Sequence, residues 1–301
     1  MSAAHAPPGD RVGFVGVGRM GSAMLRCMLE AGYPATLCDR SQAATAPFLA
    51  DFPDRVRVAA RPGDAASQAD IVSVVVNTNE QLEQACLGEG GVIAGARDGG
   101  VVLVHSTVSH ATLATLCRAG AERGVHVLDA PVSGARGHLS VGELAVMVGG
   151  AKTAFERAKP VMETYGSLVL HLGGSGAGLD AKLAINVFRY LCMAAGQEAT
   201  RLAERVGIGD AMADLVAHTQ SNRYVGDSAR LRLMKDVPDA QRKKDAELAQ
   251  KDLRAAIARG REVDVELPSA EVALGLMHRL WGTEPAPGPG PGGDRDALDK
   301  R

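Results

Sequence analysis

The stretch Arg11–Met24, with the sequence RVGFVGVGRMGSAM, decides how the first half of the chain folds. Its pattern G-x-G-x-x-G, at positions 16–21, follows the apolar run Arg11–Gly16 and opens Arg19–Ala31, where apolar residues recur at spacings of three and four. The run predicts a buried strand and the recurrence predicts a helix. In such a junction the first glycine permits a tight turn, the second lets a ligand approach the backbone, and the third lets helix and strand pack closely.

A helix N-terminus offers unpaired N–H groups and a partial positive charge, so this junction predicts a phosphate-binding turn. The pattern in this context is typical of proteins that bind a dinucleotide. We expect six consecutive residues to contact that cofactor: Gly16, Val17, Gly18, Arg19, Met20 and Gly21.

Asp39 and Arg40 give opposing signals about the cofactor. Asp39 ends the next predicted strand, 18 residues after Gly21. A carboxylate there accepts hydrogen bonds from the adenosine ribose hydroxyls and repels a 2′-phosphate, which favours NAD. The guanidinium of Arg40 can stack on adenine or grip a 2′-phosphate, which favours NADP. The sequence favours NAD and leaves NADP open.

Short apolar runs alternate with helical stretches through the first half of the chain. After the first strand these runs are Ala35–Cys38, Ala69–Val76, Val101–Val104, Val125–Leu128, Leu144–Val148 and Ser167–Leu170. The alternation is typical of βαβ units, in which helices cover both faces of a parallel sheet. We predict a Rossmann-type, doubly wound α/β domain over residues 11–174.

The pattern changes at Gly173–Gly178, GGSGAG, where we expect a flexible segment. Beyond it every periodic run indicates a helix: Leu179–Val206, Ala211–Thr219, Ala240–Ala258 and Ser269–Trp281. We predict an all-helical domain over residues 175–283, joined to the first domain by a long helix. Residues 284–301, which begin with a run rich in proline and glycine, are expected to form a flexible tail.

Composition excludes several classes of protein. The 301 residues are 46% apolar and 23% charged with a net charge of −2, which is ordinary for a globular chain and gives no sign of a nucleic-acid partner. The apolar runs are far shorter than the ~20 residues that span a bilayer, so we expect no membrane partner. Five scattered cysteines form no CxxC pair, and the histidines show no ligand spacing. We expect a cytoplasmic protein without a bound metal.

Four stretches, in this order, resemble the motifs of the β-hydroxyacid dehydrogenase family. They are Gly13–Met24; Asp129–Gly134 (DAPVSG) with Met147–Gly150 (MVGG) after it; Gly176–Asn186 (GAGLDAKLAIN); and Lys251–Leu253 (KDL). That family includes 3-hydroxyisobutyrate dehydrogenase and tartronate semialdehyde reductase and is related to 6-phosphogluconate dehydrogenase. The resemblance extends over residues 11–280.

The resemblance implies an NAD(P)-dependent oxidoreductase that interconverts a small β-hydroxy acid and its semialdehyde or keto acid. It implies an active site in the cleft between the two domains. It also implies that subunits pair through the helical domain, as a homodimer or homotetramer.

The resemblance assigns catalytic roles to Lys182 and Asn186. The reaction needs a group that takes a proton from a hydroxyl while hydride leaves its carbon, and a lysine does this where its amine is neutral. Asn186 lies four residues after Lys182 and so shares its helix face, where it can orient the lysine or the substrate. The alternative for Asn186 is an amide satisfied within the core.

The resemblance assigns Ser133 and Gly134 to the substrate carboxylate. Ser106, which follows a predicted strand, is expected near the substrate, at the sheet edge where ligands bind in such folds. The expected cofactor contacts at the same edge, and one later in the chain, are Val76, Asn77, Thr107 and Lys251. Two alternatives remain open: a helix cap for Ser106 or Thr107, and a solvated charge run for Lys251.

Some positions depart from the family pattern. Asn77 stands where many members have leucine-proline, and Ala135, Arg136 and His138 stand beside the expected carboxylate site. These departures leave the substrate's identity open. Two other functions are alternatives: an imine reductase-like enzyme and a non-catalytic dinucleotide-binding module. Relatives of both kinds typically lack a lysine at the position of Lys182, so this residue favours the dehydrogenase.

Overall fold

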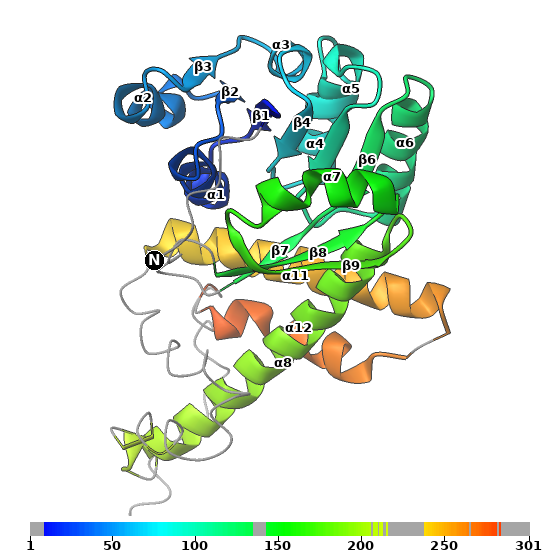
Figure 1. Ribbon diagram of the computed structural model, residues 1–301. Coiled ribbons are helices and arrows are strands. Elements are labelled where there is room, and N and C mark those ends of the chain that lie inside the picture. Colours follow the sequence, from blue (N-terminus) through cyan, green and yellow to red (C-terminus); the bar gives the residue numbers. More distant parts are fainter. Residues whose placement is uncertain are drawn as a thin grey trace, which may run out of the picture. The chain divides into compact units, whose positions relative to one another are not determined.

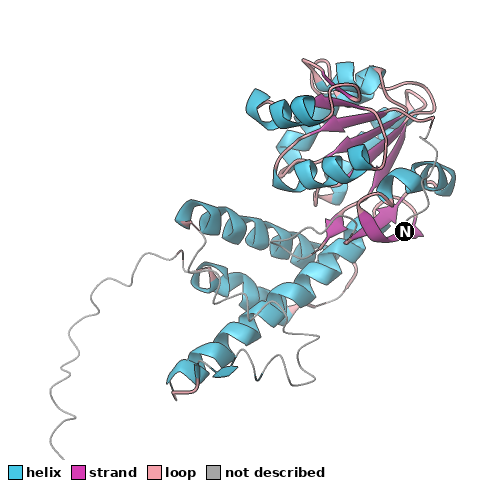
Figure 2. Cartoon of the chain, turned by 60° about the vertical axis from the view of Figure 1, so that its left-hand side comes forward, coloured by secondary structure: helices cyan, strands magenta, loops and turns pink. Residues whose placement is uncertain are grey.

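The structure is a computed structural model that describes residues 9–134, 143–205, 207–209, 211–212, 215, 238–264, 266–281 and 283. The chain divides into two compact units, one up to Ala184 and one from Ile185 onward. The first is an α/β unit and the second is helical (Figures 1 and 2). Within the described residues, no helix is both long and apolar enough to cross a membrane.

A nine-stranded sheet forms the centre of the first unit, in the order β3-β2-β1-β4-β5-β6-β8-β7, with β9 also paired to β8. The strands are β1 (Val12–Val15), β2 (Ala35–Cys38), β3 (Val56–Val58), β4 (Ile71–Val74), β5 (Val101–Val104), β6 (His126–Asp129), β7 (Val132–Ser133), β8 (Leu144–Gly149) and β9 (Gly166–Gly173). The pairs from β3 to β6 are all parallel, which confirms the predicted doubly wound arrangement.

The expectation of a wholly parallel sheet is wrong at one end. Strand β8 pairs antiparallel with β6 and β7 and parallel with β9. Only positions 134–143 separate β7 from β8, and a parallel return needs a dozen or more connecting residues. Strand β3 was not predicted either, because a three-residue strand with two exposed side chains has no readable periodicity.

Helices cover both faces of this sheet (Figure 1). They are α1 (Arg19–Glu30), α2 (Gln42–Asp51), α3 (Pro62–Ser67), α4 (Asn79–Leu87), α5 (Val92–Gly95), α6 (His110–Ala121) and α7 (Lys152–Met162). Successive residues of a strand point to opposite faces. In β5, Val101 and Leu103 join a core with residues of α1 and α7, whereas Val102 and Val104 join a second core with residues of α3 to α6.

Three long helices account for most of the described residues after position 176: α8 (Ala177–Arg205), α11 (Asp239–Glu262) and α12 (Pro268–Leu280). The predicted helical second half is confirmed in these residues. The helical unit has its own core, in which Tyr190 and Met193 of α8 pack with Leu253 of α11 and Met277 of α12. Most of the predicted helix Ala211–Thr219, the tail 284–301, Arg136 and His138 lie outside the described residues.

The expectation of a flexible segment at Gly173–Gly178 is wrong. Strand β9 runs to Gly173, α8 begins at Ala177, and Gly176 and Gly178 are buried. Within the segment, the N–H of Gly176 donates a hydrogen bond to a side chain of β6, which is described below.

Candidate active site

Parallel pairing aligns the carboxyl ends of five strands in one row. Val15 is level with Cys38 on one side and Val74 on the other, Val74 is level with Val104, and Val104 is level with Asp129. The residues that follow these positions therefore emerge at a single edge of the sheet. That edge includes the reversal of strand order between β1 and β4, which is where ligands bind in open α/β sheets.

The glycine turn after β1 has the geometry that the pattern predicts. Gly16 has φ 93°, and a Cβ there would collide with the carbonyl oxygen of Val75. A Cβ on Gly21 would collide with the carbonyl oxygen of Gly16, so helix and turn pack backbone to backbone. A Cβ on Gly18 would meet no atom within 4 Å, so its backbone is open to a ligand.

The start of α1 fits the pyrophosphate of a nicotinamide dinucleotide. Gly18 is the N-cap, and the first turn, which begins with Arg19 and Met20, contains no carboxylate. The partial positive charge of this helix end is thus left for an anion. Val17 is buried beneath the turn, Arg19 is exposed and Met20 is half-buried.

Asp39 ties the glycine turn to the end of β2. Its Oδ2 accepts a hydrogen bond from the N–H of Val17 at 2.6 Å, and its Oδ1 accepts one from the N–H of Ser41 at 2.8 Å. A carboxylate oxygen has two acceptor positions, so each oxygen keeps one for a ribose hydroxyl. The neighbouring Arg40 is exposed.

Two hydrogen bonds join the loops that follow β4 and β5. The N–H of Val76 donates to Ser106 Oγ at 3.0 Å, and the N–H of Ser109 donates to Asn79 Oδ1 at 2.9 Å. The buried Ser106 hydroxyl therefore positions the backbone of the neighbouring loop. Thr107, beside it, is half-buried, and Asn77 is exposed.

The helix-cap alternative for Ser106 and Thr107 is wrong, because Ser109 occupies the N-cap of α6. Its hydroxyl accepts a hydrogen bond from the N–H of Thr112 at 3.1 Å.

The expected carboxylate segment lies on β7, where Ser133 is level with Ala145 of β8. Ser133 and Gly134 are half-buried. A Cβ on Gly134 would collide with the side chain of Leu144.

Asp129, at the end of β6, is hydrogen-bonded to the start of α8. Its side chain is fully buried, its Oδ1 accepts a hydrogen bond from the N–H of Gly176 at 2.8 Å, and its Oδ2 accepts one from the N–H of Leu179 at 2.9 Å. We call these contacts the Asp129 clamp. No role is predicted for Asp129 from the sequence, where its one signal is a lone carboxylate in the apolar run Val125–Val132.

Lys182 lies three residues after Leu179 on α8, so the two share a helix face. The lysine is buried, with 8% of its surface exposed. Asn186 is one turn further along the same helix and is 1% exposed.

Within the helical unit, Asn186 Nδ2 donates to Asp252 Oδ2 at 2.9 Å. The buried Asp252 also lies 3.3 Å, through Oδ1, from Lys251 Nζ. Asn186 thus has a core partner, as its alternative interpretation requires, while its Oδ1 has no hydrogen-bond partner among the described residues. Asp252 is the middle residue of the KDL motif, and its hydrogen bond to Asn186 was not predicted from the sequence.

A buried histidine, His105, follows β5 at the same edge of the sheet. His105 Nδ1 lies 2.7 Å from the carbonyl oxygen of Ala130, so Nδ1 is the protonated nitrogen. Its Nε2 lies 3.3 Å from both Ser73 Oγ and Tyr165 Oη. Burial lowers the pKa of His105 to about 4, so the ring is neutral at physiological pH.

A second histidine lies beside α8. His110 Nε2, at the start of α6, is 3.0 Å from Asp180 Oδ1, in the first turn of α8. Among the described residues, no group of three or more His, Cys, Asp or Glu side chains is arranged to hold a metal ion.

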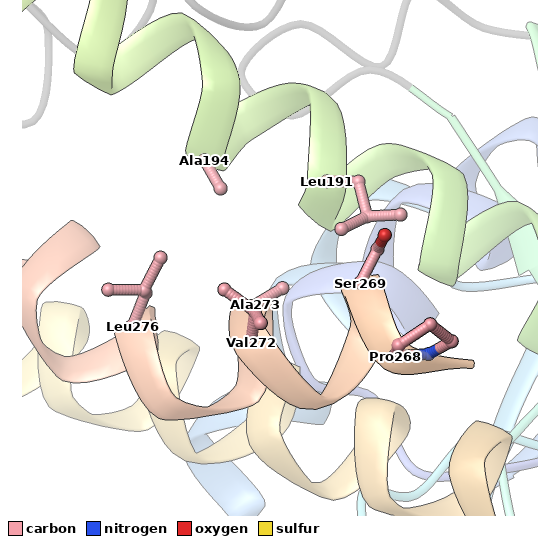
Figure 3. Close-up of a pocket in the computed structure, with 7 residues that line it drawn as sticks. All are labelled: Leu191, Ala194, Pro268, Ser269, Val272, Ala273 and Leu276. Atoms are coloured by element: carbon pink, nitrogen blue, oxygen red, sulfur yellow. The ribbon is translucent and has the colours of Figure 1, made fainter. Parts of the chain in front are cut away.

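The helical unit contains a hollow of about 350 Å³ between α8 and α12 (Figure 3). Its lining is apolar except for Ser269: Leu191, Ala194, Pro268, Ser269, Val272, Ala273 and Leu276. No ionisable group lines it, so we do not place the chemistry there.

The chain is similar to known oxidoreductases in sequence and in fold. Residues 11–173 match the family model described as the NAD binding domain of 6-phosphogluconate dehydrogenase. The chain is 33% identical over 294 residues to an uncharacterized oxidoreductase of Mycobacterium tuberculosis, covering 93% of this chain and 98% of that protein. It is 31% identical over 217 residues to L-threonate dehydrogenase of Cupriavidus necator, covering 71% of this chain and 72% of that one.

Among solved structures, the chain is similar to that of 3-hydroxyisobutyrate dehydrogenase from Salmonella typhimurium. The TM-score is 0.76 at 29% identity, over 89% of this chain and 93% of that one.

Proposed function

This chain belongs to the β-hydroxyacid dehydrogenase family, and on that premise we propose that Lys182 is the general acid/base of its reaction. The protein is an NAD(P)-dependent oxidoreductase that interconverts a small β-hydroxy acid and its semialdehyde or keto acid. The observation that supports the role of Lys182 most is its burial on α8, at 8% exposure, one turn beyond the Asp129 clamp.

The proposed proton transfer uses the neutral amine of Lys182. In oxidation, Nζ takes the proton of the substrate hydroxyl while a hydride leaves the carbon that bears this hydroxyl. In reduction, the ammonium returns a proton to the carbonyl oxygen. When bound, the nicotinamide supplies the hydride acceptor or donor. Burial favours the neutral form of a lysine, which is the form that accepts a proton. We assign Asn186 to orienting the lysine or the substrate from the next turn of α8.

The start of α1 is the proposed site of the cofactor's pyrophosphate, held by the backbone of residues 16–21. Val76, Asn77 and Thr107, at the same sheet edge, and Lys251, on α11, are the further proposed contacts. Asp39 is proposed to accept hydrogen bonds from the adenosine ribose hydroxyls. Its carboxylate would repel a 2′-phosphate, so NAD is the preferred cofactor. Its two backbone hydrogen bonds support this, because they hold the carboxylate where a 2′-phosphate would be repelled. We assign Arg40 to the face of the adenine.

Ser133 and Gly134 are proposed to bind the substrate carboxylate through the serine hydroxyl and backbone N–H groups. Ser106 is proposed to lie near the substrate; its link to Val76 supports a role in shaping the pocket. The substrate is a small β-hydroxy acid of the class that the relatives' names describe. We assign the protein to the cytoplasm, since five cysteines without a CxxC pair suit a reducing compartment.

Subunits are proposed to pair through the helical unit, as a homodimer or homotetramer. Exposed apolar side chains on its helices support this, among them Val272 at 64% exposure, which lines the hollow in Figure 3. Sedimentation of the purified protein tests it: a single species at monomer mass contradicts the proposal.

Nicotinamide absorbance with a small panel of substrates tests the catalytic proposal. The panel contains 3-hydroxyisobutyrate, glycerate, 3-hydroxypropionate, 4-hydroxybutyrate, L-threonate, L-serine and the corresponding aldehydes, with NAD(H) and NADP(H) run separately. We expect Lys182→Ala to lower kcat by about 10³-fold, within the range for loss of a general base, with the KM for the dinucleotide unchanged.

Lys159→Ala is the matched control, because that lysine is half-buried on α7, away from the candidate site, and pairs with Glu163. It should leave kcat unchanged. A Lys182→Ala variant as active as the wild type contradicts the proposed role. Dinucleotide binding without turnover of any hydroxy acid would instead favour imine reduction or a non-catalytic role.

A further inference from the structure

We infer that Asp129 is a positioning residue for the proton transfer: its buried carboxylate fixes the first turn of α8 and thereby places the amine of Lys182. The inference rests on the proposed function of Lys182. It concerns a residue that has no place in the chemistry itself, because its carboxylate is fully buried and both of its oxygens accept hydrogen bonds from backbone N–H groups.

The Asp129 clamp satisfies the two N–H groups that a capping box normally satisfies. In that motif a side chain at the N-cap binds the N–H of the third helical residue, and a side chain there binds the N–H of the N-cap. Gly176, which precedes α8, has no side chain to use, and Leu179 has no polar atom. Asp129 reaches both N–H groups from a strand 47 residues or more away along the sequence.

A fully buried carboxylate is costly unless hydrogen bonds and favourable charge compensate it. Here the compensation comes from two backbone N–H groups and the partial positive end of α8. Moving the helix start would leave the carboxylate without these partners in a buried position. The clamp therefore resists displacement of α8 in a way that apolar packing alone does not.

Glycines leave the helix start little room to move toward the sheet. A Cβ on Gly178 would collide with the carbonyl oxygen of Met147 and lie 2.9 Å from Asp129 Oδ2. A Cβ on Gly149 would lie 2.6 Å from Asp129 Oδ1. The first turn of α8 is thus pressed onto the backbone of β8 and the carboxylate of β6, with no side chain between them to yield.

The clamp connects two parts of the proposed site. Leu179, whose N–H it binds, is followed three residues later by Lys182, about 4.5 Å further along the helix axis. Asp129 is itself followed, within five residues, by Ser133 and Gly134, the proposed carboxylate segment. One side chain therefore holds the proton-transfer helix and the substrate segment in register.

Asp129→Asn tests the inference, because it keeps the size of the side chain and removes the charge and one acceptor. A displacement of about 1 Å in a reacting group can cost about 10²-fold in rate. We expect kcat to fall by 10- to 100-fold, and the KM for the dinucleotide to stay within twofold of wild type, since α1 is untouched.

A double-mutant cycle shows whether Asp129 acts through Lys182. In a Lys182→Ala background, Asp129→Asn should change the residual rate by less than twofold, because nothing remains for it to position. An equal loss in both backgrounds would overturn the inference, as would a kcat within twofold of wild type in the single variant. Failure of the proposed function looks different: Lys182→Ala then retains activity.

Asp70→Asn is the matched control. Asp70 Oδ2 also accepts a backbone hydrogen bond, from the N–H of Arg11 at 3.1 Å, but Asp70 immediately precedes β4, at the opposite end of that strand from the candidate site. It should leave kcat within twofold of wild type.

Amide hydrogen exchange of the wild-type protein tests the clamp without any variant and without turnover. Leu179 and Gly21 are each the third residue of their helix, α8 and α1. In the dinucleotide-free protein we expect the Leu179 amide to exchange about tenfold or more slowly than that of Gly21, because only Leu179 donates to a buried carboxylate. Equal exchange at the two positions would overturn the inference, including in the case that Asp129→Asn does not fold.

Discussion

Helices α1 and α8 begin beside the same edge of the sheet, and each follows a glycine, yet their N-termini are treated differently. The first turn of α1 after Gly18 has no carboxylate of its own. The start of α8, after Gly176, is bound by the buried carboxylate of Asp129. One N-terminus is left open and the other is filled by the protein.

The contrast shows that one physical feature serves two purposes. A helix N-terminus has orphan N–H groups and a partial positive charge, so it attracts an anion in either case. A helix N-terminus that is left open, as at α1, can bind the phosphates of a cofactor that dissociates after each turnover. An N-terminus that binds Asp129, as at α8, is fixed by intramolecular hydrogen bonds and can hold Lys182 in place.

The largest expected effect is on the filled end. Gly178→Ala introduces a Cβ that collides with the carbonyl oxygen of Met147, and a backbone group cannot move aside cheaply. We expect the free energy of unfolding to fall by about 3 kcal/mol or more, measured by denaturant titration. Gly174→Ala is the control, since a Cβ there would meet no atom within 4 Å. A Gly178→Ala variant as stable as the wild type would mean that the first turn of α8 does not pack closely against the backbone of β8.

Acid should loosen the region beside α8 through His105, which bonds the carbonyl oxygen of Ala130, next to Asp129. Its pKa is lowered from 6.5 to about 4 in the folded state, so folding favours the neutral ring. This contribution is complete above pH 6.5, is lost as the pH falls from 6.5 to 4, and amounts to about 3 kcal/mol.

Comparison of wild type with His105→Asn, by denaturant titration between pH 4 and pH 7, isolates this term from the other titrating groups. Asparagine keeps a donor for Ala130 and does not titrate, so the pH dependence of its stability should be shallower by that amount. Parallel curves would contradict the assignment.

A substitution at the open N-terminus of α1 should change dinucleotide binding and leave the free energy of unfolding unchanged. Gly18→Ala adds a Cβ where the protein has no atom within 4 Å and where φ is −72°, which alanine adopts freely. We expect unfolding free energy within about 0.5 kcal/mol of wild type. The KM for the dinucleotide should rise about tenfold, because the methyl group occupies the approach of the pyrophosphate. An unchanged KM would place the phosphates elsewhere.

The smallest effect comes from making the open end resemble the filled one. Arg19→Glu puts a carboxylate in the first turn of α1. The dinucleotide-free protein should gain about 0.3–1 kcal/mol of stability, and dinucleotide binding should weaken, because the carboxylate competes for the same positive end. Thermal unfolding with and without cofactor measures both. Arg19→Gln separates loss of the guanidinium from the added charge; equal behaviour of the two variants would contradict this account.

Sequence pattern was sufficient for the strands that are buried on both faces. The strands β1, β2, β4 and β5 are buried on both faces, so they appear as short apolar runs between glycines or polar residues. Strand β3 has no such signal, because two of its three side chains are exposed. The reversed direction of β8 was also unreadable, since an apolar run does not encode the direction of its neighbours.

The candidate site divides in a similar way. The glycine turn and Asp39 are predictable because each depends on a few adjacent residues and a fixed spacing. The hydrogen bonds of Asp129 and the one between Asp252 and Asn186 could not be predicted, because they join residues 47 or more positions apart in the sequence. Glycine content alone suggested a flexible segment at Gly173–Gly178, whereas Gly178 allows close packing against Met147 of β8.

The sequence by itself determined the doubly wound α/β unit, the helical second half, the glycine turn at residues 16–21 and the family. All of these depend on local pattern, where residue type and spacing act over one or two turns of chain. Only the tertiary structure decided that Asp129 closes the start of α8 while the start of α1 stays open. Both helix starts are glycine-rich in sequence, and the difference depends on which distant carboxylate the fold brings to them.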